Sequence, residues 1–161
     1  MSDRLRVYVI DDERPAIQRL ERLVAARGDA TVCGSETDPE RALAQCRDLA
    51  PDVVLADIEM PGIDGVTLAA SLKRLPLPPA IVFVTAFERY AVDAFELAAT
   101  DYLVKPVRPE RLGRALERAR VHPRQDKPRL RSRVGERIIS VPVDEVRALV
   151  AEDKYTTVHY P

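Results

Sequence analysis

The chain has 161 residues, of which 46% are hydrophobic, which suits one ordinary domain followed by part of a second. The net charge of −1 excludes a uniformly basic nucleic-acid-binding protein. The charge balance nevertheless changes along the chain. Residues 1–121 hold 17 basic and 20 acidic residues, whereas residues 122–161 hold 8 and 6.

Signals for membranes or disulfides are missing from the sequence. No apolar run approaches the roughly 20 residues of a membrane-spanning helix, and the charged amino terminus is unlike a signal peptide. Cys33 and Cys46 are too few for a disulfide framework or a cysteine metal site, and both are expected to be small buried side chains. We therefore expect a cytoplasmic protein without membrane contacts.

Short apolar runs alternate with helical apolar stripes as far as residue 121. The stripes fall within residues 17–24, 42–49, 68–75, 91–98 and 112–119. Such alternation indicates βαβ units with right-handed crossovers, and hence an α/β fold with a doubly wound (βα)5 parallel sheet. The five expected strands are Val7–Ile10, Thr31–Gly34, Val53–Ala56, Ile81–Val84 and Tyr102–Val104.

The last forty residues differ in character from the rest. The polar segment 122–130 contains two prolines and is predicted to be a linker. Residues 131–161 contain a hairpin pattern around Gly135–Glu136 and further strand candidates at 149–151 and 155–160, which predicts a partial β-rich unit. We therefore divide the chain into a domain at 1–121, a linker at 122–130 and an incomplete domain at 131–161.

Polar side chains follow four of the expected strands, at the edge of a parallel sheet where ligands usually bind. They are Asp11, Asp12, Asp57, Thr85 and Lys105. Three crowded carboxylates require a cation, and a set of oxygen ligands without histidine or cysteine favours Mg²⁺. An aspartate beside this cation can attack phosphorus to form an acyl phosphate, and Lys105 can supply positive charge to a phosphoryl oxygen.

Each of these residues also has an ordinary structural explanation. Asp11 and Asp12 could cap a helix, and Asp57 could begin a turn. Thr85 could end a strand, and Lys105 could be a solvated charge. The convergence of all of them on one edge is what favours a phosphoryl-transfer site.

These motifs resemble the signature of the receiver domains of two-component response regulators, which have a flavodoxin-like fold. The resemblance spans roughly residues 4–121. The segments that carry it are Ile10–Glu13, Asp57 with Met60–Gly65, Val84–Ala86 and Tyr102–Pro106.

The resemblance implies a role for each residue of the pocket. Asp57 would accept a phosphoryl group from the phosphohistidine of a sensor histidine kinase. Mg²⁺ would be bound directly by Asp12, Asp57 and the backbone carbonyl of Glu59, and largely through water by Asp11. Lys105 would pair with the phosphoryl group.

A conformational switch is also implied by the resemblance. Thr85 would move toward the phosphoryl group and Tyr102 would rotate inward, which would change the face formed by the fourth helix, fifth strand and fifth helix and favour homodimerisation. In that family, the positions occupied here by Glu59 and Phe87 tune the lifetime of the aspartyl phosphate. His122 and His159 lie outside the pocket and are not expected to carry phosphoryl groups.

The tail is similar to the opening of LytTR-type DNA-binding domains, in the segments Ile139–Val146 and Ala151–Val158. The main DNA-contacting segments of that family lie further along than Pro161. The expected function is a response regulator, not a turnover enzyme, that controls transcription through a LytTR domain incomplete in this chain. DNA would be a partner only of the complete domain.

Three other functions remain as alternatives. A stand-alone receiver would signal through protein–protein contacts without DNA. A metal-dependent phosphatase also uses an aspartyl nucleophile, but usually places it with a second aspartate two residues away on the first strand. A dinucleotide-binding sheet is disfavoured because no G-x-G-x-x-G motif follows the first strand.

Overall fold

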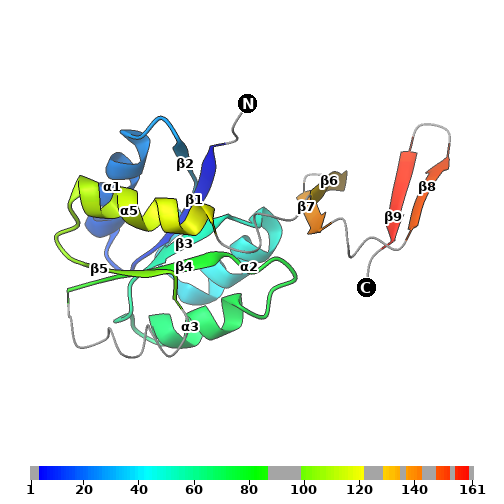
Figure 1. The fold of residues 1–161 in the computed structure, drawn as a ribbon. Coiled ribbons are helices and arrows are strands. Elements are labelled where there is room, and N and C mark those ends of the chain that lie inside the picture. The colour runs from blue at the N-terminus through cyan, green and yellow to red at the C-terminus, as the bar shows by residue number, and fades with distance from the viewer. Residues whose placement is uncertain are drawn as a thin grey trace.

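A parallel five-stranded sheet forms the centre of the protein, with the strand order β2-β1-β3-β4-β5 (Figure 1). The computed structural model describes residues 4–86 and 99–121, together with the backbone of four strands between residues 129 and 159. The strands of the central sheet are β1 (Leu5–Ile10), β2 (Ala30–Glu36), β3 (Val53–Ala56), β4 (Ala80–Thr85) and β5 (Asp101–Val104).

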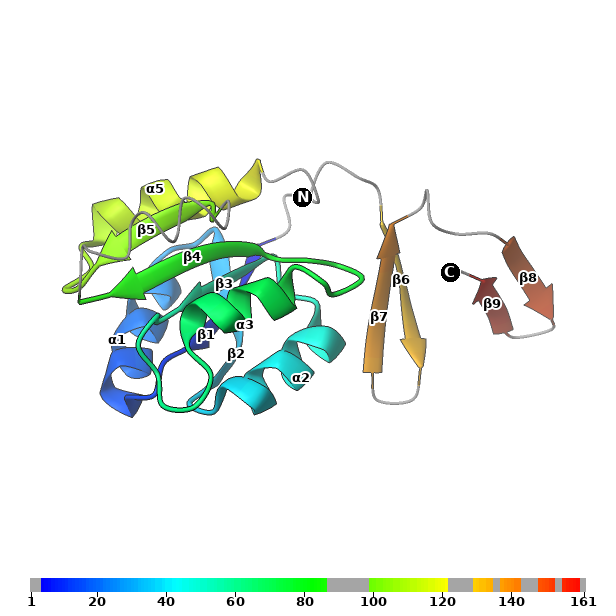
Figure 2. The same ribbon diagram turned by 90° about the horizontal axis from the view of Figure 1, so that it is seen from below.

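Helices cover both faces of this sheet (Figures 1 and 2). Helices α1 (Arg14–Ala25) and α5 (Pro109–Arg120) lie on one face, and α2 (Pro39–Leu49) and α3 (Gly65–Leu72) lie on the other. The predicted doubly wound α/β architecture is confirmed. The helix expected at residues 91–98 lies outside the described residues.

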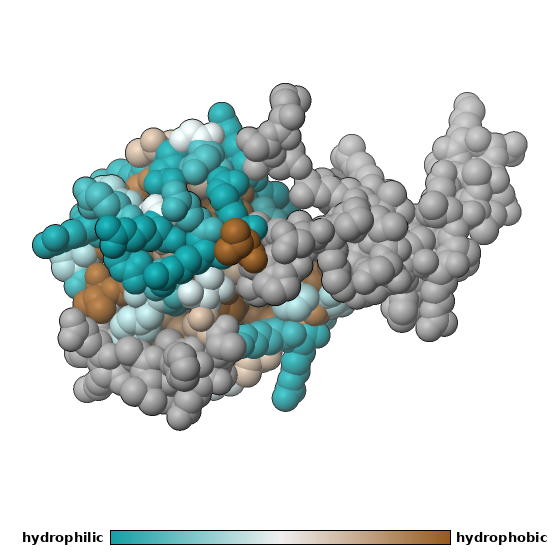
Figure 3. Space-filling model, in the orientation of Figure 1, coloured by the Kyte–Doolittle hydropathy of each residue, from teal (hydrophilic) through white to brown (hydrophobic). Residues whose placement is uncertain are grey.

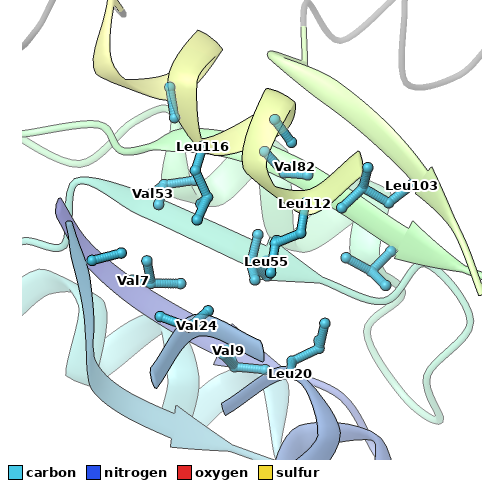
Figure 4. Close-up of a cluster of buried hydrophobic side chains, with 14 of the residues drawn as sticks. Val7, Val9, Leu20, Val24, Val53, Leu55, Val82, Leu103, Leu112 and Leu116 are labelled. Carbon is cyan, nitrogen blue, oxygen red and sulfur yellow. The ribbon is translucent and has the colours of Figure 1, made fainter. Parts of the chain in front are cut away.

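The two faces of the sheet bury two separate apolar clusters because side chains alternate along each strand. On β1, Val7 and Val9 pack with α1 and α5, as Figure 4 shows for that cluster. Tyr8 and Ile10 instead join the cluster under α2 and α3. The apolar runs in the sequence are therefore strands buried on both faces.

The element boundaries depart from the predicted ones in places. Strand β3 matches its prediction, while the other four strands are longer. Helix α3 ends at Leu72, three residues before the buried Leu75 that was assigned to its stripe. Cys33 is half-buried rather than buried, unlike Cys46.

The starts of α2 and α1 are capped differently. The side chain of Asp38 accepts a hydrogen bond from the backbone N–H of Glu40 at 3.0 Å and caps α2. The suggestion that Asp11 and Asp12 cap α1 is wrong, because the residue at the cap is Glu13 and its side chain makes no capping bond. The two aspartates therefore do not cap α1 and lie at the edge of the sheet.

Two antiparallel strand pairs are described beyond the central sheet. Strands β6 (Arg129–Val134) and β7 (Arg137–Pro142) form one pair, and β8 (Ala148–Glu152) and β9 (Tyr155–His159) form the other. Strand β6 begins inside the segment 122–130 that was assigned to the linker.

A buried carboxylate fastens α5 to β5. Asp101 is 9% exposed, and its two oxygens accept hydrogen bonds from Arg111 at 2.7 and 2.9 Å. Arg118, further along the same helix, forms an ion pair with this carboxylate at 3.1 Å. Burial alone would raise the pKa of Asp101, but the hydrogen bonds and charges of the arginines lower it below its usual 3.8.

The last turn of α5 is attached separately, through a contact with Asp29. Arg120 donates a hydrogen bond to the backbone carbonyl of Asp29 and lies 3.5 Å from its carboxylate. The same carbonyl accepts a hydrogen bond from the N–H of Leu5 at 2.9 Å, at the start of β1. Helix α5 is therefore tied to the edge of the sheet where β1 and β2 begin.

Replacement of Asp101 by asparagine should destabilise the protein by about 2 kcal/mol at neutral pH, because it removes the charge that two arginines share. A carboxyl group with a lowered pKa stabilises the fold above its unfolded-state value of 3.8, and this stabilisation is lost as the pH falls through the lower folded-state pKa. Urea unfolding of both proteins from pH 7 downward measures the effect. A difference in stability that did not shrink below about pH 3.8 would contradict this explanation.

Candidate functional site

The ends of four neighbouring strands place the predicted polar residues at one edge of the sheet. Asp11 follows β1, Asp57 follows β3, Thr85 closes β4 and Lys105 follows β5. The backbone N–H of Asp57 donates to the carbonyl of Ile10 at 3.0 Å, so the β1–β3 pairing continues into the site. Residues far apart in the sequence thus meet because parallel strands end together.

Lys105 joins two of the carboxylates. Its Nζ donates to Oδ2 of Asp11 at 2.7 Å and to Oδ2 of Asp57 at 3.2 Å. Asp11 is 1% exposed and Asp57 is 8% exposed, whereas Asp12 is open to solvent. The peptide bond between Lys105 and Pro106 is cis.

Backbone donors fix the second oxygen of each buried carboxylate. Oδ1 of Asp11 accepts a hydrogen bond from the N–H of Glu13 at 2.9 Å. Oδ1 of Asp57 accepts one from the N–H of Glu59 at 3.3 Å. Both carboxylates are therefore oriented by the loops that follow their own strands.

Burial and neighbouring charges shift the pKa values of three groups in the pocket. Burial raises the pKa of Asp57, and the charge of Asp11 raises it further, although Lys105 acts in the opposite direction. Burial and the neighbouring Asp11 likewise raise the pKa of Asp12. Burial lowers the pKa of Lys105, but its contacts with the two aspartates outweigh burial and raise it.

This arrangement fits a magnesium ion. Asp11, Asp12 and Asp57 each offer a carboxylate oxygen, and these oxygens lie within 4.8 Å of one another. Three carboxylates and one ammonium group leave two negative charges, which a divalent cation would balance. The donors are all oxygens, the ligands that Mg²⁺ prefers.

The residues expected to form a switch are neighbours on the sheet. In the β4–β5 register Phe83 lies opposite Tyr102, and Thr85 lies opposite Val104. Thr85 and Tyr102 are therefore diagonal neighbours on one face of the sheet. Thr85 is buried and Tyr102 is half-buried. Phe87 and His122 lie outside the described residues, and His159 ends β9.

An apolar hollow of about 340 Å³ lies beside Lys105. Helix α1 contributes one wall and the loop after β5 contributes the other, with Arg19 donating to the carbonyl of Val107 at 3.3 Å. No sequence pattern predicted this hollow, because its walls come from segments that only the fold brings together. The lining residues are Ala16, Arg19, Leu20, Val84, Lys105, Pro106 and Val107.

The fold and the acidic edge define a class of α/β domains with a carboxylate pocket, and comparisons with known proteins identify the family. The response regulator receiver domain family matches residues 7–117. Over 97% of its length the chain is 38% identical to the positive alginate biosynthesis regulatory protein of Pseudomonas aeruginosa, of which it spans 69%. It is 39% identical to the sensory transduction protein LytT of Bacillus subtilis, over 71% of this chain and 47% of that one.

A solved structure agrees with these sequence matches. The response regulatory domain of protein mrkE from Klebsiella pneumoniae is 34% identical, with a TM-score of 0.65, and the match covers 71% of this chain and 93% of that domain. The chain belongs to the response regulator receiver family. It spans about half the length of several curated relatives, such as 47% of LytT.

Replacement of Asp12 by asparagine should raise the melting temperature at neutral pH when divalent cations are removed. The raised pKa of Asp12 means that the folded protein resists ionisation of this group. The resulting loss of folding stability is absent below the unfolded-state pKa of about 3.8 and grows as the pH rises through the folded-state pKa of Asp12.

Thermal unfolding in a chelator and in excess Mg²⁺ measures this effect. In Mg²⁺ the order should reverse, because the wild-type protein gains stability from binding the ion and the variant gains less. The control is Asp38→Asn. Asp38 is distant from the pocket residues in sequence, and its carboxylate caps α2. Equal Mg²⁺ stabilisation of the wild type and Asp12→Asn would contradict the assigned ligand set.

Proposed function

We propose that this response regulator is switched by phosphorylation of Asp57 by a partner sensor histidine kinase. The observation that carries the proposal is the pocket in which Asp11, Asp12 and Asp57 meet Lys105. Such a pocket is suited to a cation and a phosphoryl group, and the chain belongs to the receiver family. The protein is then a phosphoryl acceptor and not a turnover enzyme on external substrates.

The chemistry follows from the positions of the side chains. An oxygen of the Asp57 carboxylate attacks phosphorus of the kinase phosphohistidine and the phosphorus–nitrogen bond breaks. The bonding electrons stay on the imidazole nitrogen, which takes up a proton from solvent to give a neutral histidine. Asp12, Asp57 and the Glu59 carbonyl would hold Mg²⁺ directly and Asp11 largely through water, and the ion would stabilise charge on the transferring group. Lys105 pairs with a phosphoryl oxygen.

The hollow beside Lys105 supports an approach of the kinase from that side. It presents apolar surface directly next to the pocket, between α1 and the loop after β5. A partner that docked there would place its phosphohistidine beside Asp57. Among the residues that the structure describes, no helix is long and apolar enough to cross a membrane. A cytoplasmic location, where histidine kinases present their phosphorylated domain, remains part of the proposal.

Phosphorylation would be reported through Thr85 and Tyr102 to the face that contains β5 and α5. Thr85 is next to Lys105 across the β4–β5 pair, since its carbonyl accepts the Lys105 N–H at 2.8 Å. Figure 3 shows mainly hydrophilic side chains over α5, while Val104 on the edge strand β5 is 36% exposed. An apolar side chain within a polar, ion-paired face suits a homodimer that forms on phosphorylation.

The output that we propose is transcription control through a LytTR-type DNA-binding domain that begins near residue 131. The tail motifs support it, as does the match to the alginate regulatory protein over 97% of this chain. DNA binding requires the remainder of that domain. If the coding sequence did not continue the β-rich unit for about 65–70 residues, a size set by typical domain lengths, the stand-alone receiver would become the better proposal.

Incubation with acetyl phosphate and Mg²⁺ should add the mass of one phosphoryl group, measured on the intact protein. Asp57→Asn should show no adduct, because the amide cannot act as the nucleophile. Asp38→Asn, whose side chain caps α2, should still be phosphorylated. An adduct on the Asp57→Asn protein would refute the proposed acceptor, and continuous release of phosphate from a phosphate ester would support a phosphatase instead.

Beryllofluoride with Mg²⁺ should increase the dimer fraction of the wild-type protein in sedimentation velocity experiments. Thr85→Ala should bind the phosphoryl analogue but lose most of this increase, because the hydroxyl that reports the new group is gone. Thr31→Ala, on the far edge strand β2, is the matched control. Dimerisation of Thr85→Ala at the wild-type level would exclude the proposed switch residue.

A further inference from the structure

Gly65 lies against the backbone of the phosphoacceptor segment. A Cβ atom built on Gly65 would overlap the carbonyl oxygen of Asp57. It would also lie 2.7 Å from Cα of Ile58 and 2.9 Å from the carbonyl carbon of Asp57. All three are backbone atoms, which cannot turn aside as the end of a flexible side chain can.

The need for glycine here is spatial and not conformational. Gly62, three residues earlier, has a φ of +84° and nothing within 4 Å of its added Cβ. That glycine is required by its backbone angle. The backbone of Gly65 has no positive φ, so an alanine would be unstrained there if the Asp57–Ile58 peptide were further away.

The two segments are also held together by hydrogen bonds. The N–H of Gly65 donates to the carbonyl of Ile58 at 2.8 Å. On the other side, the N–H of Asp57 is bonded to Ile10 in β1. The peptides on either side of the Asp57–Ile58 peptide are therefore hydrogen-bonded, one to strand β1 and the other to the first turn of α3.

Neither side of this contact can retreat easily. Helix α3 buries Leu68, Ala69 and Leu72 against the sheet, each at 1% exposure or less. A side chain at position 65 would thus displace the loop of Asp57, Ile58 and Glu59. This loop contains the N–H that orients Oδ1 of Asp57, and the carbonyl of Glu59 that we assign to the magnesium ion.

We propose that Gly65 is a positioning residue of the acidic pocket. Because Gly65 has no side chain, the first turn of α3 can lie against the Asp57–Ile58 peptide. This contact sets the orientation of the Asp57 carboxylate and the Glu59 carbonyl. This inference rests on the proposed function. It assigns a role to Gly65, which the sequence analysis noted only as the end of the segment Met60–Gly65. In the fold Asp64 caps α3, and Gly65 is the first residue of that helix.

The test compares Gly65→Ala with two matched variants. Asp64→Ala removes the hydrogen bond of 2.8 Å from the N–H of Thr67 to the cap, and so destabilises the same helix without adding an atom near Asp57. Gly28→Ala adds the same methyl group where nothing lies within 4 Å. Asp64→Ala controls for a loss of helix stability, and Gly28→Ala controls for the glycine-to-alanine change itself. An effect seen only in Gly65→Ala is therefore a change in the pocket.

Two measurements are made well below the melting temperature of each variant. Calorimetric titration with Mg²⁺ should show roughly 10- to 100-fold weaker binding by Gly65→Ala, the range typical of residues that orient metal ligands, and wild-type binding by both controls. In a chelator, the ¹H–¹⁵N resonances of Asp57 and Glu59 should shift in Gly65→Ala and stay in place in Asp64→Ala.

The outcomes distinguish this inference from the proposed function. If the wild type does not bind Mg²⁺, the proposed metal site fails, and the metal-free resonances still decide the role of Gly65. If Gly65→Ala matches Asp64→Ala in both measurements, Gly65 is a helix residue only and the inference is overturned. If Gly65→Ala is partly unfolded, all variants are compared in trimethylamine N-oxide, which favours the folded state. Failure to fold even there would also overturn the inference.

Discussion

The structure depends on an electrostatic conflict at the end of the sheet. Parallel strands bring Asp11 and Asp57 into a nearly closed space, where burial and the neighbouring charge of Asp11 raise the pKa of Asp57. Lys105 offsets only part of that charge, through contacts of 2.7 and 3.2 Å. A site with this imbalance is stabilised by added positive charge, and any group exchanged at Asp57 changes the partners available to Lys105. The sensitivity of the domain to phosphorylation would follow from this incomplete neutralisation.

The rest of the domain transmits or resists changes at that edge. Backbone N–H groups of the following loops orient the carboxylates, while α3 lies against the loop that follows Asp57. At the start of β5, the contacts between Asp101 and the arginines of α5 join helix and strand. A change at Thr85 would therefore reach the surface of α5 through a connected pair of elements.

Much of this could be predicted from the sequence, because the informative patterns are local. Apolar runs that stop at Asp11, Asp57 and Lys105 mark strand ends, and alternation with helices dictates that these ends meet. The association of Lys105 with Asp11, 94 residues apart, depends on the register of the assembled sheet and has no local pattern. The pairing of Asp101 with Arg111 depends instead on how α5 packs against β5. The tight contact at Gly65 was also hidden, because an Asp-Gly pair suggests a turn equally well.

The tie between Arg120 and Asp29 has a consequence for the path of any signal. It places the last turn of α5, from which the chain continues toward the tail, beside the first residues of β1 and β2. The acidic pocket lies at the opposite ends of those strands. Strand β1 has six residues, and at about 3.3 Å per residue the two ends are roughly 20 Å apart. The last turn of α5 is thus roughly that far from the phosphoryl group itself, and a signal reaches this end of the domain only through a change in its shape or assembly.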